Sequence, residues 1–115
     1  PFDSTTSFRP GARFGPSAMR HESFGLETYS PYQDRDLMDI RVFDSGDLEL
    51  CFGSSEMALS DIEKRAEEIL KAEKIPVLLG GEHLVTLAAV RAVFHKYPDL
   101  HISQIKSCMC VAKMP

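Results

Sequence analysis

The chain has 115 residues, of which 43% are hydrophobic and 26% charged, and its formal net charge is −4. This composition predicts one folded domain and excludes a disordered chain, because the apolar share is ordinary and the net charge is low. The longest nearly apolar stretches, residues 76–79 and 87–90, fall far short of the roughly 20 residues that a membrane-spanning helix needs. The 17 acidic residues outnumber the 13 Lys and Arg, which argues against nucleic acid as the main partner.

The cysteines and the first residues bear on the cellular compartment. An odd set of three cysteines, Cys51, Cys108 and Cys110, does not suit a disulfide framework. The chain does not open with a basic leader and an apolar run, the pattern of a secretory signal. We therefore expect a reducing, cytoplasmic location.

Residues 1–31 predict an irregular region that contains one short helix. Its Pro-Gly and Gly-Pro dipeptides are typical of loops. Pro16 suits the first position of a helix, which would end near Gly25. Residues 40–43 then alternate apolar and charged side chains and meet the turn sequence of residues 44–47, which predicts a strand that ends in a turn.

From residue 60 the hydrophobic period becomes that of an amphipathic helix. Ser60 and Glu63 match a capping box, and apolar residues recur at helical spacing up to Leu70. The apolar run at residues 75–79 predicts a strand that is buried on both faces.

A second helix is expected from Leu84 to about Phe94, followed by a further strand that begins at Leu100. Strand, helix, strand, helix and strand in this order predict an α/β fold with a parallel sheet.

The sequence Gly80-Gly81-Glu82-His83 lies at the carboxyl end of the second expected strand, where open α/β sheets bind ligands. Two glycines allow a sharp turn and a close approach. A neutral His83 imidazole beside them is a good ligand for a divalent metal. Because one histidine is not a metal site, the local spacing alone favours a simple turn.

Three other features each have two interpretations. Arg9 and Arg13 either clamp a carboxylate or hold their loop through backbone carbonyls. Carboxylates in residues 44–47 either face the ligand crevice or form a solvated turn. Cys108 and Cys110 are either half of a thiolate metal site or part of an accidental tail.

Five short segments occur together in an order typical of one enzyme family: residues 1–3, 7–16, 29–32, 43–47 and 79–83. The run Arg-Pro-Gly-x-Arg-x-Gly-Pro and the later Gly-Gly-Glu-His are the most specific of them. With these segments the chain resembles the agmatinase branch of the arginase/agmatinase ureohydrolase family, from residue 1 to about residue 102.

The resemblance implies a three-layer αβα fold with a parallel sheet, incomplete in this chain, and a homo-oligomer when the protein is full length. It divides the chain into residues 1–102, part of a ureohydrolase domain, and residues 103–115, a non-matching tail. The implied reaction is hydrolysis of a guanidino substrate, agmatine, to urea and putrescine by a hydroxide that bridges two manganese ions. His83 matches the family's first metal-binding histidine. The loop residues expected near the site are Arg9, Gly11, Arg13, Gly80, Gly81 and Glu82.

Residues 103–115 do not match the family's second motif, Asp-Ala-His-x-Asp, so His83 is the only expected ligand and no catalytic residue is assigned. One imidazole cannot hold two divalent ions that prefer several carboxylate oxygens. We therefore expect this chain alone not to hydrolyse agmatine. We also expect it to be aggregation-prone or partly unfolded, since its last strand is an open apolar edge. The alternatives are another amidinohydrolase, such as a guanidinobutyrase or formimidoylglutamase, and a non-catalytic subunit that associates with intact partners.

Overall fold

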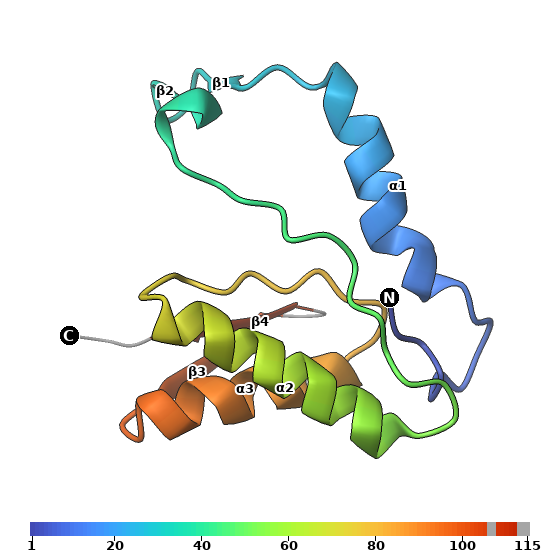
Figure 1. Ribbon diagram of the computed structural model, residues 1–115. Coiled ribbons are helices and arrows are strands. Elements are labelled where there is room, and N and C mark those ends of the chain that lie inside the picture. The colour runs from blue at the N-terminus through green and yellow to red at the C-terminus, as the bar shows by residue number, and fades with distance from the viewer. Residues whose placement is uncertain (106–107, 113–115) are drawn as a thin grey trace.

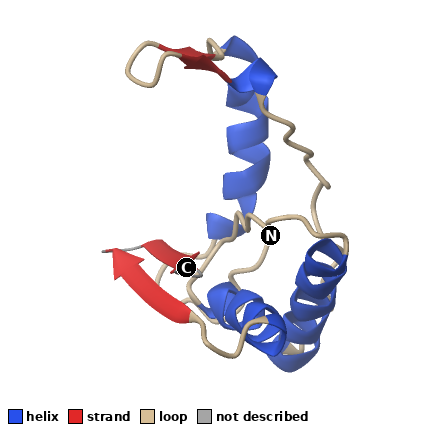
Figure 2. Cartoon of the chain, turned by 90° about the vertical axis from the view of Figure 1, so that its left-hand side faces the viewer, coloured by secondary structure: helices blue, strands red, loops and turns tan. Residues whose placement is uncertain are grey.

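A computed structural model describes residues 1–105 and 108–112. The helices in this part of the chain are α1 (Gly15–Glu22), α2 (Ser55–Lys71) and α3 (Leu84–Lys96), and the strands are β1 (Tyr29–Ser30), β2 (Arg35–Asp36), β3 (His101–Ile105) and β4 (Cys108–Ala112). Single 3-10 turns lie at Ala12–Phe14, Ser23–Gly25 and Leu37–Asp39. Helices α2 and α3 lie side by side, and α1 extends away from them together with β1 and β2 (Figures 1 and 2). Among these helices, none combines the length and the apolar character needed to cross a membrane.

The first helix forms where the sequence predicts it. Pro16 lies in the first turn of α1 and is the buried residue of that helix. Its fixed φ and missing N–H cost nothing at this position. The helix passes into the 3-10 turn that ends at Gly25, as expected.

Helix α2 begins five residues before the predicted start. Ser54 is its N-cap, and the Ser54 side chain accepts a hydrogen bond from the Met57 backbone N–H at 3.2 Å. This bond satisfies one of the free N–H groups of the first turn. The predicted capping box of Ser60 and Glu63 is therefore wrong, because both residues lie inside the helix. The buried side of α2 consists of Ala58, Leu59, Ile62, Ala66 and Leu70.

Helix α3 begins at Leu84, as predicted. Small side chains allow it to pack closely against α2. Ala88 and Ala92 lie one turn apart on α3 and are 0% and 1% exposed. The buried residues form two clusters, one of Phe2, Ala58, Leu59, Ile62, Val85 and Ala88, the other of Ala66, Leu70 and Ala92. Phe2 thus brings the start of the chain into the helix pair, next to the N-terminus of α3.

Residues 40–43 and 75–79 are not strands, which corrects two predictions. Both segments lack a paired strand within the described residues, and their apolar side chains are largely exposed, with Ile75 at 88% and Val77 at 81%. A strand exists only through hydrogen bonds to a neighbour, so an apolar run without a partner stays irregular.

The final strand begins at His101, next to the predicted start, but it is not parallel to another strand. β3 pairs antiparallel with β4, with Ser103 opposite Cys110, and β1 pairs antiparallel with β2. The described strands therefore form two separate two-stranded ladders. The described residues therefore do not form the expected parallel sheet.

Candidate functional site

The loop that carries the Arg-Pro-Gly-x-Arg sequence is organised around the carboxylate of Asp3. Asp3 Oδ2 accepts the backbone N–H of Gly11 at 2.6 Å and that of Arg13 at 3.0 Å, while Oδ1 accepts the Arg13 Nε–H. Gly11 has a φ of 136°, a conformation that only glycine adopts without strain. The Asp3 side chain is buried, and these bonds replace the water that it loses.

The same bonds set the charge state of Asp3. The hydrogen bond from the Arg13 backbone is the strongest influence, and it acts with the Gly11 N–H and the Arg13 guanidinium to hold the pKa of Asp3 below its usual value, although burial opposes them. Asp3 therefore stays an anion, and Arg13 is its counter-ion.

The Gly80-Gly81 turn packs directly against this loop. A Cβ added to Gly81 would lie 2.2 Å from the Phe2 carbonyl oxygen and 3.1 Å from the Ala12 carbonyl carbon. A Cβ on Gly80 would meet the Val85 side chain. The close approach that the two glycines allow, expected from the sequence, is thus made to the chain's own backbone.

Glu82 and His83 follow this turn. The Thr5 hydroxyl donates a hydrogen bond to Glu82 Oε1 at 2.5 Å, which is a second connection between the N-terminal loop and the turn. His83 is the N-cap residue of α3, where its carbonyl accepts the Thr86 N–H at 3.0 Å. The His83 side chain itself is exposed.

The His83 side chain lines two shallow hollows. One, of about 370 Å³, is lined by Thr5, Thr6, Ser7, Phe8, Glu82, His83 and Leu84. The other, of about 420 Å³, is lined by His83, Leu84, Leu87, Val90 and Ile102. The imidazole therefore lies between a hollow of mixed polar and apolar lining and an apolar one, and because this side chain is exposed it is accessible to a metal ion.

The two arginines of the loop do not act together. The Arg13 guanidinium makes a single contact, from Nε, to the internal carboxylate of Asp3, so Arg13 holds its own loop through a side-chain carboxylate and does not form the expected two-nitrogen clamp. Arg9 is exposed, and its guanidinium lies 5.2 Å from the centre of the Phe8 ring, a cation–π contact.

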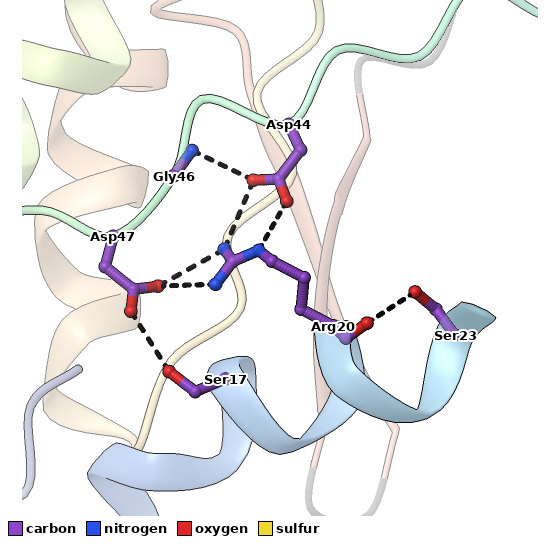
Figure 3. Close-up of polar contacts among 6 residues, drawn as sticks. All are labelled: Ser17, Arg20, Ser23, Asp44, Gly46 and Asp47. Carbon is purple, nitrogen blue, oxygen red and sulfur yellow. Dashed lines mark hydrogen bonds and ion pairs between the residues drawn. The ribbon is translucent and has the colours of Figure 1, made fainter.

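Asp44 and Asp47 are bound by a residue that sequence reasoning missed, Arg20 of α1 (Figure 3). Arg20 Nε and Nη2 donate to the two Asp44 oxygens at 2.6 and 3.2 Å, and Arg20 also donates to Asp47 Oδ1 at 3.3 Å. Ser17 donates to the other Asp47 oxygen at 3.1 Å. The bond from Arg20 is the main reason that the pKa of Asp44 is lowered. These carboxylates are therefore engaged by α1.

The metal-binding capacity of the described residues is limited near His83. Among residues 1–103, whose side chains the structure describes, the one group of three or more His, Cys, Asp or Glu with ligand atoms close together is Glu63, Glu67 and His95, which does not include His83. Glu82, the neighbouring carboxylate, is bonded to Thr5. One imidazole does not fit a centre of two manganese ions. The thiolate interpretation of Cys108 and Cys110 concerns side chains outside those that the structure describes.

Comparison with known proteins places the chain in the arginase family. The model of the arginase family matches residues 1–107. An agmatinase of Bacillus subtilis is 52% identical over 102 residues, which are 89% of this chain and 35% of that protein. The N(1)-aminopropylagmatine ureohydrolase of Thermococcus kodakarensis is 41% identical over 95 residues, 81% of this chain and 33% of that protein. The chain thus spans about a third of the length of these relatives.

A solved structure supports the same assignment. A protein from Clostridium difficile, described as a "putative agmatinase", is 54% identical and superimposes with a TM-score of 0.82 over 84% of this chain and 35% of its own. This match confirms the α/β fold class expected from the sequence, although the strands of the described residues pair only as two antiparallel ladders. The chain belongs to the arginase family and carries part of its fold.

Proposed function

We propose that this chain belongs to an agmatinase-type ureohydrolase, which hydrolyses agmatine to putrescine and urea and depends on manganese. The observation that carries the proposal is the position of His83, exposed at the N-cap of α3 and lining both hollows. The name of the Bacillus subtilis relative, agmatinase, supports the choice of substrate. The proposed domain is residues 1–102, with residues 103–115 as a tail outside it.

In this proposal the N-terminal loop and the Gly80-Gly81 turn hold the metal ligand His83 in place. Asp3 and its partners Gly11 and Arg13 fix the N-terminal loop, against which Gly81 is packed. The turn then directs His83 outward. Arg9, Gly80 and Glu82 belong to the same two segments and have supporting roles.

We further propose that the chain alone does not catalyse the reaction, because its described residues offer His83 as a single ligand near the hollow. The active protein would be cytoplasmic and a homo-oligomer, and it would supply the remaining ligands.

A chimera tests this function directly. Residues 1–102 of this chain would replace the matching part of the Bacillus subtilis relative, which is 52% identical there. We expect the chimera to release urea from agmatine with Mn²⁺. The His83→Ala chimera should lose at least about tenfold in manganese affinity, since even removing a residue that hydrogen-bonds to a metal ligand costs this much. His21→Ala, an exposed histidine on α1, is the matched control. Equal manganese affinity in the His83→Ala and His21→Ala chimeras would contradict the role of His83.

The second candidate is another amidinohydrolase, such as a guanidinobutyrase or formimidoylglutamase. It is favoured by the similarity to a ureohydrolase that is named for N(1)-aminopropylagmatine rather than agmatine. The same chimera, supplied with each guanidino or formimino compound in turn, separates these candidates by the rate of product release.

A non-catalytic subunit is the third candidate. The exposed apolar side chains of residues 75–79 favour it, because they offer a surface for an intact partner. Co-purification with a full-length ureohydrolase, lost when Val77 is replaced by Lys, would support this candidate.

A further inference from the structure

Three side chains with metal-ligating atoms meet where the last turn of α3 passes α2. Glu63 and Glu67 are four residues apart on α2 and therefore share one face, and His95 comes from α3. One ligand atom from each lies within 4.8 Å of the others. His95 Nδ1 is 3.2 Å from Glu67 Oε1 and 3.6 Å from Glu63 Oε1.

These spacings suit a small tetrahedral ion. Zinc bonds to imidazole nitrogen and carboxylate oxygen are about 2.0 Å long, so two ligand atoms of a tetrahedral centre lie about 3.3 Å apart. The two distances from His95 Nδ1 lie on either side of this value. The ligand oxygens of Glu63 and Glu67 lie within 4.8 Å of each other, so rotation of these side chains would complete the set around an ion.

We propose that Glu63, Glu67 and His95 form a binding site for a zinc-type divalent cation, which would connect α2 to α3. Two carboxylates balance the charge of the ion, and the imidazole favours a transition metal over calcium or magnesium, which prefer oxygen. The two glutamate side chains are partly shielded, at 20% and 32% exposed, whereas the His95 side chain is 61% exposed. Because the site is open to solvent at His95, a water molecule can occupy the fourth coordination position of the ion.

The helices beneath the three ligands are already held together. Ala66, Leu70 and Ala92 form a buried cluster between α2 and α3. Lys96, next to His95, donates to the Leu70 carbonyl at 2.5 Å and to Glu73 at 2.8 Å. The backbones that carry the ligands are thus fixed before any ion arrives, so little order has to be gained on binding.

Three ion pairs compete with the cation. A protonated His95 would pair with both glutamates, and Lys71 lies 3.8 Å from Glu67 Oε2. Exposed pairs of this kind contribute little stability, so a divalent ion held by three ligands should displace them.

The proposed cation site is separate from His83. His83 and His95 lie at opposite ends of α3, and 12 residues of helix correspond to about 18 Å. A failure of the proposed ureohydrolase function therefore leaves this inference standing, and the reverse also holds.

The test is a Zn²⁺ titration by calorimetry of the full 115-residue chain with His83→Ala, so that any signal arises elsewhere. We expect one equivalent to bind, and His95→Ala, Glu63→Gln and Glu67→Gln each to weaken binding at least about tenfold. Glu68→Gln, on the same helix but paired with Arg65, is the matched control and should leave the affinity within about twofold. Circular dichroism of each variant verifies that the helices persist.

A second measurement separates this site from the cysteines. Co²⁺ added to the same chain should give an absorption spectrum without a thiolate-to-cobalt charge-transfer band, and zinc should raise the melting temperature of the His83→Ala chain but not that of the His83→Ala, His95→Ala chain. Absence of zinc binding, equal affinity in the His95→Ala and Glu68→Gln variants, or a thiolate band would overturn the proposal.

Discussion

Asp3 shows how one residue orders the loop beside His83. Its buried carboxylate accepts hydrogen bonds from two backbone N–H groups and from the Arg13 side chain. One side chain therefore fixes the conformation of the loop at several points. Removing one partner of such a network leaves the others without a hydrogen bond, which costs more than the bond itself contributes.

We predict that Asp3→Asn lowers the melting temperature by several degrees, because an amide cannot accept all three bonds or neutralise Arg13. Thermal denaturation followed by circular dichroism measures the change. Asp99→Asn, at an exposed position after α3, should leave the melting temperature nearly unchanged. Equal melting temperatures for the two variants would show that Asp3 does not organise the loop.

Gly81 gives a second prediction at the level of single residues. Gly81→Ala should lower the free energy of unfolding by about 1–3 kcal/mol, the usual cost of inserting an atom into a packed region, because the added Cβ would meet the Phe2 carbonyl. Gly25→Ala has open space around its Cβ and is the control. Urea denaturation of both variants measures the difference, and a neutral Gly81→Ala would contradict the close approach.

At the level of secondary structure, the start of α2 depends on Ser54. We predict that Ser54→Ala lowers the free energy of unfolding by about 1 kcal/mol, since the first turn loses its cap. Ser60→Ala, inside the helix and exposed, should be neutral or slightly stabilising, because alanine has the higher helix propensity. The opposite order of the two variants would support the capping box at Ser60 that the sequence suggested.

The sequence predicted correctly those elements that form through interactions between residues close together in the chain. Pro16 indicated α1, and apolar spacing indicated α3 from its first residue, because both signals arise within a few residues. The start of α2 was missed since Ser54 and Ser60 both satisfy the preference for a capping serine. The strands at residues 40–43 and 75–79 were wrong because pairing depends on a distant partner, which no local pattern contains.

In the candidate site, too, local features could be predicted from the sequence, whereas contacts between distant segments could not. The Gly-Gly-Glu-His sequence indicated the turn that carries His83, and the structure places that turn at the N-terminus of α3. The pairing of Arg20 with Asp44, across 24 residues, left no signal in the spacing of the sequence. Side-chain contacts between separate segments become visible only in three dimensions.

For the whole molecule, acid should destabilise the fold. The pKa values of four carboxyl groups are lowered in the folded chain, those of Asp3, Asp36, Asp44 and Glu73. A lowered pKa contributes stability above the ordinary carboxyl pKa of about 4, and this stability is lost as the pH falls through the lowered value. We therefore predict a melting temperature that decreases steadily below about pH 4.

Arg20→Gln isolates one part of this pH dependence. Without the guanidinium, the pKa of Asp44 should return toward its usual value, because the hydrogen bond from Arg20 is the main cause of its shift. The variant should therefore lose less stability between pH 6 and pH 3 than the unchanged chain, with Arg41→Gln as an exposed control. Identical pH profiles for all three proteins would refute this cause.

The contact between the first residues and the turn before α3 has a consequence for the order of folding. The hydrogen bond from Thr5 to Glu82 closes a loop of 77 residues, and such closure carries a large entropic cost before any contact rewards it. The α2–α3 pair, which is close in sequence, should therefore assemble early, and the surroundings of His83 should form last. A hydrogen-exchange experiment would then find slow exchange in the amides of the helix pair while the amides of Gly11 and Arg13 still exchange quickly.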